Sequence, residues 1–391
     1  MFQPITAGVV AAISGFATSF ALVIAGLQAV GASQLQASSG LLVLCLTVGI
    51  ASIVLAWRYR MPISFAWSTP GAALLVAAGQ NHANFAAAVG AFLVCALLIV
   101  LCGLWPALGR AITRIPKPIA SAMLAGILLP ICIAPVTASI QYPLLGLPIV
   151  VTWFVLYRVA PRWAVPGAML VATVVIIVSA GTGWLQSAVI APQLSFVAPV
   201  FDPLVIVSLG LPLFIVTMAG QNVPGFVVMS TYGYETPPAP PLVASGVLSA
   251  AGALFGGHVI NLAAITAAIM ASPEASPDKS KRWIATVTAG ILYLALGLGA
   301  GVATALVAAS PPILIVAVAG LAVLGALITS ITTALEDARH RVTAIATFLV
   351  TASEITIVGI GSAFWGLLVG AAFMLWLGGR REAHPVRTPA S

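Results

Sequence analysis

The chain has 391 residues, of which 61% are hydrophobic and only 6% are charged, and its formal net charge at pH 7 is +7. A soluble domain carries about 25% charged residues, so a chain this poor in charge cannot cover a water-facing surface. Composition therefore excludes a soluble protein and predicts an all-α polytopic protein embedded in a lipid bilayer.

The first predicted span begins close to the N-terminus. Residues 1–20 are apolar but have no basic region and no convincing small-residue cleavage site, so we interpret them as part of a span and not as a cleaved signal. A helix needs about 20 apolar residues to cross the hydrocarbon, and several later runs are too short to cross as continuous helices. In chain order the apolar runs predict about fourteen transmembrane segments: 6–30, 38–57, 63–80, 84–108, 118–134, 140–157, 164–182, 204–220, 240–256, 258–271, 283–307, 312–334, 342–357 and 361–378.

Basic residues occur in clusters between which two spans fit, or four spans between Arg162 and Lys279. Every cluster therefore falls on one side of the membrane, which the positive-inside rule identifies as the cytoplasm, and both termini fall there too. Topology thus explains the net positive charge, and no nucleic-acid partner is indicated. The clusters are Arg58/Arg60, Arg110/Arg114/Lys117, Arg158/Arg162, Lys279/Lys281/Arg282, Arg339/Arg341 and Arg380/Arg381/Arg387.

Residues that could support catalysis or hold a metal are scarce. No Asp or Glu precedes Asp202, so the first half of the chain offers no carboxylate for catalysis, cation coordination or proton relay. An intramembrane enzyme needs a nucleophile and base, or metal ligands, that face one another, so we predict neither an enzyme nor a cofactor. Four scattered cysteines form no C-x-x-C pair and are predicted to be inert buried thiols: Cys45, Cys95, Cys102 and Cys132.

Two stretches about 194 residues apart are each predicted to enter the membrane extended and then become helical. In 62–74, extended-favouring residues precede Thr69, which is a favoured N-cap, and Pro70, which is favoured at the first helical position. In 257–269, extended-favouring residues precede Asn261, another favoured N-cap, after which a helix is predicted to begin. Segments 3 and 10 are therefore predicted to be short strands followed by half-helices.

A helix that starts inside the bilayer exposes unpaired N–H groups and a partial positive charge. Such backbone is tolerated only where it is buried in protein or lines a cavity. Two such ends at one cavity would bind an anion without Arg or Lys. The alternative is a mere kink at 68–70 and a helix–helix hydrogen bond at Asn261. The matching positions favour the site, and they favour a seven-plus-seven inverted repeat as in many secondary transporters.

Polar residues near this crevice are the candidate site residues. His258 is the one histidine expected in the interior, and it is either a structural donor or a proton-coupling group, since its ordinary pKa lies near the working range. Gln28 and the 221–225 stretch, a predicted helix stop, either orient a carboxylate or satisfy broken backbone. Phe65 either stacks on a planar substrate or packs, and Glu354 is predicted in the turn between spans 13 and 14. The predicted substrate-binding set is Phe65, Ser68, Thr69, Gly71, Gln28, Gln221, Asn222, Asn261, Leu262 and Ala263.

Three stretches, 62–74, 219–225 and 257–269, together resemble the benzoate/proton symporter family, and the resemblance covers nearly the whole chain. It implies proton-coupled import of benzoate across the bacterial inner membrane. That family is distantly similar to uracil permeases and to sulfate and bicarbonate transporters, whose seven-plus-seven fold has a core domain and a gate domain. The resemblance implies core domain in 1–117 and 201–310, gate domain in 118–200 and 311–379, and a cytoplasmic tail in 380–391.

The chain departs from the nucleobase permeases at one point. Those proteins carry glutamates on spans 8 and 10, whereas the matching neighbourhoods here offer Gln221, Asn222, His258 and Asn261 and no acid. Glutamates would repel a carboxylate substrate, so their loss fits an anion. Benzoate itself rests on the resemblance alone. Uncoupled transport or exchange of another small organic anion stays open, as does a homodimer.

Overall fold

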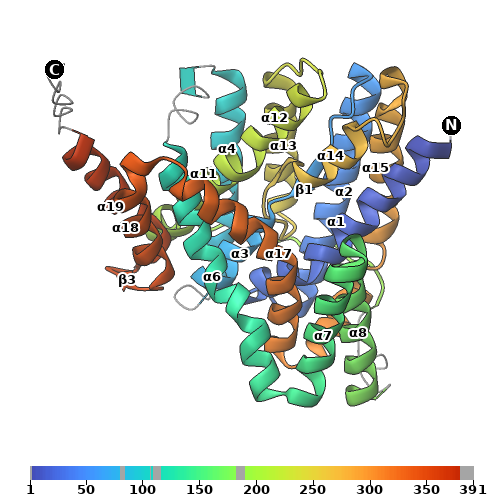
Figure 1. Cartoon of the computed structure of the whole chain (residues 1–391), viewed down its shortest axis with the longest axis horizontal. Coiled ribbons are helices and arrows are strands. Elements are labelled where there is room, and N and C mark those ends of the chain that lie inside the picture. The colour runs from blue at the N-terminus through green and yellow to red at the C-terminus, as the bar shows by residue number, and fades with distance from the viewer. Residues whose placement is uncertain (1, 80–83, 106, 109–115, 182–189, 379–391) are drawn as a thin grey trace, which may run out of the picture.

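The structure is a computed structural model and describes residues 2–79, 84–105, 107–108, 116–181 and 190–378 (Figure 1). The predicted tail 380–391 lies outside the described residues. In the first half of the chain the elements are α1 (Phe2–Ala29), α2 (Gln34–Tyr59), β1 (Phe65–Trp67), α3 (Thr69–Ala78), α4 (Phe85–Leu104), α6 (Lys117–Gln141), α7 (Pro143–Val159), η1 (Pro161–Trp163) and α8 (Ala164–Ala180).

The second half is also mainly helical. Its elements are α10 (Pro203–Val205), η2 (Ile206–Gly210), α11 (Leu211–Thr217), η3 (Met218–Asn222), α12 (Val223–Thr231), α13 (Ala239–Ala253), β2 (Ile260–Leu262), α14 (Ile265–Ala271), η4 (Lys279–Lys281), α15 (Trp283–Gly297), α16 (Ala300–Ala308), α17 (Pro312–Leu335), η5 (Ala338–His340), α18 (Arg341–Ala352), β3 (Thr356–Ile357), β4 (Ile360–Gly361) and α19 (Ser362–Gly378).

Six described helices are long and apolar enough to cross a membrane: α1, α2, α4, α6, α17 and the helix Pro203–Thr231. This last helix runs continuously from α10 through α12. A seventh candidate is the pair α15–α16, which bends by 57° at its break. Five further apolar helices are shorter, namely α3, α7, α8, α13 and α19. The polytopic membrane protein predicted from composition is confirmed. The count of fourteen segments depends on the shorter helices and stays a prediction.

The helix at Pro203–Thr231 corrects one prediction. The stretch 221–225 was expected to stop a helix, but the helix continues to Thr231. The physical reason is a π-helical turn, η3, which ends directly before α12, and Pro224 is the second residue of α12. A π turn shifts the backbone hydrogen-bond register, so the proline nitrogen falls where its missing N–H does not break the helix.

Strands β1 and β2 form an antiparallel pair with the register Phe65↔Leu262, Ala66↔Asn261 and Trp67↔Ile260. The pair packs against α2, α13 and η3 in the interior (Figure 1). Phe65 and Trp67 are among the largest fully buried side chains of the described residues. The core is therefore built around a short ribbon whose two strands lie about half a chain apart.

A second group of helices surrounds the contact between α6 and α17, with α7 and α18 against α6, α8 against α7 and α19 against α18 (Figure 1, left and lower part). Gly320 on α17 allows this close contact, because a side chain there would collide with the carbonyl oxygen of Ile131 on α6. α18 and α19 are joined by the β3–β4 hairpin, whose turn residues Val358 and Gly359 both have positive φ, 54° and 74°. The prediction that Glu354 lies in the connection between these two helices is confirmed.

Basic loops from distant parts of the sequence meet at one end of the molecule. The Arg60 guanidinium lies 4.3 Å from the ring centroid of Trp283. The Lys279 ammonium donates to the carbonyl oxygen of Gly233, and the Tyr234 hydroxyl donates to the carbonyl oxygen of Lys279 at 2.9 Å. The start of α1 and the end of α19 both lie toward the top of Figure 1.

Candidate substrate site

The β1–β2 ribbon brings together the two stretches that the sequence predicts to be extended. Its ladder continues beyond the strands, since the Ser68 N–H donates to the carbonyl oxygen of Val259 at 3.1 Å and the Ala263 N–H donates to that of Ser64 at 2.9 Å. Residues 64–68 and 259–263 are therefore one structural unit, and segments 3 and 10 meet there.

The outward N–H groups of the ribbon are held by side chains. Phe65 donates to Ser52 Oγ at 3.1 Å, and Ile260 donates to Ser249 Oγ at 2.8 Å. An unpaired N–H in an apolar interior costs several kcal/mol, so these serines make the ribbon tolerable at this depth. Neither serine is among the residues predicted from the sequence. The only signal is a serine on the preceding helix, 13 residues before Phe65 and 11 residues before Ile260.

Asn222 plays the same part at another edge position. The Leu262 N–H donates to Asn222 Oδ1 at 2.9 Å, and the Asn222 side chain is fully buried. The sequence left two roles open for this amide, orienting a carboxylate or satisfying broken backbone. In the structure it satisfies the backbone of β2. Gln221 and Gln28 are only half-buried, and they lie on η3 and at the end of α1.

The half-helix α3 starts one residue earlier than its predicted cap implies. Its N-cap is Ser68, whose Oγ accepts the Gly71 N–H at 3.1 Å, while Thr69 and Pro70 are the first two helical residues. Proline is tolerated in the first turn because that turn has no internal acceptor for its nitrogen. The Ser68 and Thr217 hydroxyls lie 2.9 Å apart, so the start of α3 is tied to α11.

The half-helix α14 starts later than predicted. It begins at Ile265 and has no side-chain cap, so the prediction that Asn261 caps it is wrong. Asn261 is paired with Ala66 in the ribbon, and the ladder runs on through Ala263, so a helix cannot begin until the ladder ends. The Asn261 Nδ2 donates instead to the carbonyl oxygen of Leu262 at 2.8 Å.

The aromatic side chains of the ribbon are packed. Trp67 Nε1 donates to Ser19 Oγ at 2.8 Å, and its ring meets Phe16 and Tyr293 edge-on at 5.9 and 5.6 Å. Phe65 is 2% exposed. In this conformation Phe65 is therefore a packing residue. A substrate could stack on its ring only if Phe65 became accessible.

Several buried polar atoms near the ribbon have no partner among the described residues. They are Ser64 Oγ, Asn261 Oδ1 and His258 Nε2. His258 is fully buried, with Nδ1 3.1 Å from the carbonyl oxygen of Val259 and its ring edge toward Phe92 at 6.5 Å. Orphaned buried groups are rare in folded proteins, so three beside one ribbon make it the candidate binding site.

One side of the site is open. Ile265 at the start of α14 is 79% exposed, although α14 packs against α1, α12 and α15. Ala66, Thr69 and Ala264 are half-buried. The accessible surface therefore runs along the starts of both half-helices, whereas Ser68, Gly71, Leu262 and Ala263 of the predicted set are buried beneath it.

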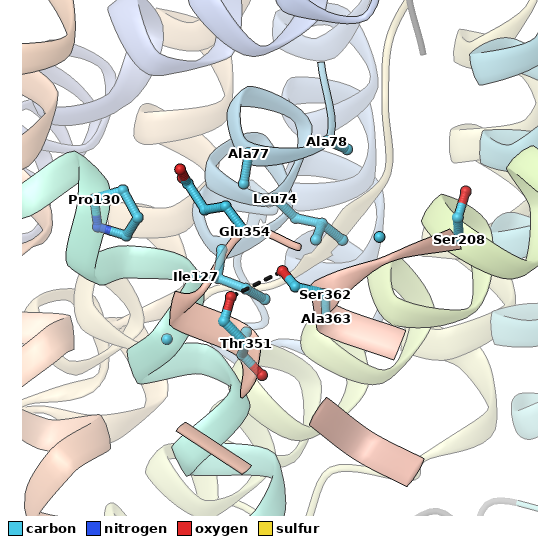
Figure 2. A pocket seen from close by; sticks show the side chains of 12 residues that line it. Leu74, Ala77, Ala78, Ile127, Pro130, Ser208, Thr351, Glu354, Ser362 and Ala363 are labelled. Carbon is cyan, nitrogen blue, oxygen red and sulfur yellow. Dashed lines mark hydrogen bonds between the residues drawn. The ribbon is translucent and has the colours of Figure 1, made fainter. Parts of the chain in front are cut away.

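A separate, small pocket lies at the other end of α3, between α3, α6, η2 and the α18–α19 connection (Figure 2). The Ser362 hydroxyl closes one wall by donating to the carbonyl oxygen of Thr351 at 2.8 Å. Glu354 supplies the one carboxylate of its lining. None of the predicted substrate-binding residues lines it. Its lining is Leu74, Ala77, Ala78, Gly126, Ile127, Pro130, Ser208, Thr351, Glu354, Gly361, Ser362 and Ala363.

Residues 2–375 match the family model described as benzoate membrane transport protein, BenE. The inner membrane protein YdcO of Escherichia coli (strain K12) is 42% identical over 366 residues, which cover 93% of this chain and 93% of that protein. The benzoate membrane transport protein of Acinetobacter baylyi is 33% identical over 323 residues, which cover 82% of this chain and 81% of that protein.

Solved structures with a similar fold include one named a bicarbonate transporter and one, murine Slc26a9, named an anion transporter. SLC26A9 matches with a TM-score of 0.62 and 16% identity over 96% of this chain and 65% of its own. The transmembrane domain of the cyanobacterial bicarbonate transporter BicA matches with a TM-score of 0.61 and 16% identity, over 94% of this chain and 97% of its own. At this identity the likeness shows the fold alone.

Proposed function

The chain belongs to the BenE family of benzoate membrane transport proteins, and from that premise we propose that it imports benzoate or a similar small aromatic carboxylate together with a proton. The observation that carries the proposal is the β1–β2 ribbon, from which α3 and α14 both start. Backbone N–H groups at such starts favour negative charge. Asp, Glu, Lys and Arg are absent from β1, α3, β2 and α14, so no side-chain charge competes with the backbone.

The proposed substrate site lies along this ribbon, between the starts of α3 and α14. The carboxyl group would face Ser68, Thr69 and Gly71 on one side and residues 261–263 on the other, with Phe65 against the ring. Gln28, Gln221 and Asn222 complete the proposed set from α1 and η3. α3 is the stronger anion contact, since it has ten residues and a capped start, whereas α14 has seven and no cap.

We further propose fourteen segments in a seven-plus-seven inverted repeat, with the core and gate domains at the boundaries predicted from the sequence. Two matched hydrogen bonds support this, because the preceding helix gives each strand one serine acceptor, Ser52 for Phe65 and Ser249 for Ile260. The likeness to SLC26A9 and BicA supports the fold. A homodimer stays a prediction.

The proposed location is the bacterial inner membrane with both termini in the cytoplasm. The named location of the relative YdcO supports the membrane. The meeting of the basic loops around Arg60 and Lys279 at one end supports the orientation, since basic residues concentrate on the cytoplasmic side. Membership of a transporter family supports transport without catalysis.

Uptake of labelled benzoate into proteoliposomes, with and without an imposed inward proton gradient, tests the function. We expect saturable uptake that the gradient accelerates and that empty liposomes lack. Saturable uptake indifferent to the gradient would favour the alternative, an uncoupled transporter or an exchanger. Failure of saturable uptake under both conditions would remove benzoate transport altogether.

His258 is the candidate protein group for the proton, and its buried, unpartnered Nε2 supports that role. The variant His258→Gln separates the possibilities. Loss of gradient-driven net uptake with retained exchange of substrate would assign the proton to His258. Unaltered dependence on the gradient would show that His258 does not carry the coupled proton. The substrate itself would then be the proton carrier.

A further inference from the structure

The two faces of the β1–β2 ribbon differ in chemistry. Side chains directly opposite in an antiparallel pair share a face, and faces alternate along each strand. With the register Ala66↔Asn261, one face carries Phe65, Trp67, Ile260 and Leu262, and it packs on α1 and α15 through Trp67. The other, here called the polar face, carries Ser64, Ala66, Ser68, Asn261 and Ala263.

Two atoms of the polar face have no partner among the described residues, Ser64 Oγ and Asn261 Oδ1. Both residues are buried, with Ser64 2% exposed and Asn261 0%. The orientation of the Asn261 amide is fixed, because its nitrogen donates to the carbonyl oxygen of Leu262. The free atom of Asn261 is therefore an oxygen, which can only accept, whereas the Ser64 hydroxyl keeps a proton to donate.

This pair distinguishes the two protonation states of a carboxyl group. A carboxylate has only acceptor oxygens. Its negative charge would repel Asn261 Oδ1, and that oxygen would still lack a hydrogen-bond donor. A protonated carboxyl offers one O–H donor and one carbonyl acceptor, which complements the pair. Ser64 and Asn261 are diagonal neighbours on their face, about 7–8 Å apart at Cα. Because they share a face, their side chains project to the same side of the ribbon.

We propose that the ribbon takes the aromatic acid as the neutral carboxylic acid, with Asn261 Oδ1 accepting its O–H and Ser64 Oγ donating to its carbonyl oxygen. This inference rests on the proposed transport of an aromatic acid. It revises the bound form, because it replaces a carboxylate at the helix starts, with its ring against Phe65, by a neutral carboxyl group on the polar face of the same ribbon. The carboxylate takes a proton from water outside, crosses with the O–H bond intact, and loses that proton in the cytoplasm. One proton crosses with each acid.

The surroundings of the pair suit a neutral ligand. α1, α3, α11, η3, α13 and α14 contain no Asp, Glu, Lys or Arg. Two titratable side chains lie beside the ribbon, His258 next to β2 and Tyr293 against Trp67 on the opposite face. The open surface at Ala66 and Ile265 gives the ring an apolar place beside the polar face.

Competition against labelled benzoate uptake by the wild-type protein tests the inference. Benzamide is neutral at every pH used and offers an N–H donor and a carbonyl acceptor, whereas benzenesulfonate is always an anion with acceptors only. We expect benzamide to compete with the same inhibition constant at pH 5.5 and pH 7.5, and benzenesulfonate to compete at least about tenfold more weakly. The KM for total benzoate should rise about tenfold per pH unit, since the neutral fraction falls tenfold.

Competition by benzenesulfonate and none by benzamide would overturn the neutral-acid inference while leaving benzoate transport intact. If no saturable benzoate uptake exists, the proposed function itself fails, so the two failures are distinguishable. The inhibitors act on the unmodified protein, and the outcome does not depend on whether a variant folds.

Variants then test the assignment of Ser64. Ser64→Ala removes the proposed donor, and we expect KM to rise about five- to tenfold, the size of one lost hydrogen bond. Thr286→Val is the matched control, because Thr286 Oγ1 is likewise buried and unpartnered but lies on α15. An unchanged KM in Ser64→Ala, or an equal rise in Thr286→Val, would overturn the role of Ser64.

Discussion

At the residue scale, single hydroxyls decide whether the ribbon can exist inside the protein. Ser249 Oγ accepts the outward N–H of Ile260, and both groups are buried. Removing the acceptor leaves a buried N–H without a partner, which costs about 1–3 kcal/mol. We therefore expect Ser249→Ala to lower the midpoint of thermal unfolding in detergent and to reduce uptake.

Ser245 on the same helix is the control for that variant. It is also fully buried, but its hydroxyl donates only to the carbonyl oxygen of Leu242 in its own helix. Ser245→Ala deletes no acceptor that another element needs, so its unfolding midpoint should stay close to that of the wild type. Equal losses in both variants would mean that volume, and not the strand hydrogen bond, is what matters at α13.

A second residue-scale prediction concerns Asp278 in the loop before α15. Hydrogen bonds from Ser280 and from Lys281 lower the pKa of the exposed Asp278 carboxyl to about 2. A lowered pKa means that the stabilisation from ionised Asp278 is present above its unfolded pKa and is lost only as pH falls through about 2. Asp278→Asn should therefore leave the pH profile of uptake between pH 5 and pH 8 unchanged. A shifted profile would place a coupling proton in this loop and not at the ribbon.

At the element scale, α14 depends on a buried arginine. Arg282 is 7% exposed, and its Nη1 donates to the carbonyl oxygen of Ala271, the last residue of α14, at 2.8 Å, while Nε donates to that of Ser276 at 2.8 Å. A cation at a helix C-terminus offsets its partial negative charge. The bond to Ala271 holds the end of this short helix, and the bond to Ser276 holds the loop that follows it.

We expect Arg282→Gln to destabilise the protein and to abolish saturable uptake, because the end of α14 and the loop after it each lose a bond. Arg282→Lys should recover uptake only in part, since a lysine has no planar fork to serve both carbonyl oxygens. Lys281→Gln is the control, because Lys281 is exposed and pairs with Asp278 at the surface. Wild-type uptake in Arg282→Gln would show that α14 holds its position without this contact. Protein abundance and the unfolding midpoint are measured beside uptake.

The sequence predicted these elements well where the signal is local. Extended residues followed by small helix formers indicated a strand and a half-helix at both 62–74 and 257–269, and the structure has β1–α3 and β2–α14 there. The errors lie where a partner far away in the chain decides. Asn261 is a good N-cap by type, but the ladder to residues 64–66 holds it in a strand. Likewise, the residues around Pro224 look the same in sequence whether they end a helix or follow a π turn that lets the helix continue.

The site shows the same division. The sequence placed His258, Asn261 and Ser68 in one neighbourhood, because their segments match across the two halves of the chain. It did not identify Ser52 or Ser249, since a serine in an apolar helix looks the same whether it bonds its own helix or a strand. It also gave no reason to single out Ser64, whose importance rests on a missing partner that only coordinates reveal.

At the scale of the whole molecule, the pocket in Figure 2 lies between the proposed domains. Leu74, Ala77 and Ala78 on α3 belong to the proposed core, whereas Ile127 on α6 and Ala363 on α19 belong to the proposed gate. If transport moves the core against the gate, this space must change shape during each cycle. A covalent link across it should therefore stop uptake.

Cysteines at Ala77 and Ala363, joined by a short thiol-cleavable cross-linker, test this in proteoliposomes. The background is Cys132→Ala, because Cys132 is half-buried while the other three native cysteines are buried. We expect cross-linking to abolish benzoate uptake and cleavage of the linker to restore it. Thr351→Cys with Ser362→Cys is the matched control, since these residues line the same pocket but both lie in the α18–α19 unit. Uptake that survives the first link would mean that these two groups of helices do not move apart, whereas arrest by both links would point to damage within the α18–α19 unit. Arrest by the first link alone, with substrate still bound, would tie the proposed domain boundary to the motion that carries the acid across.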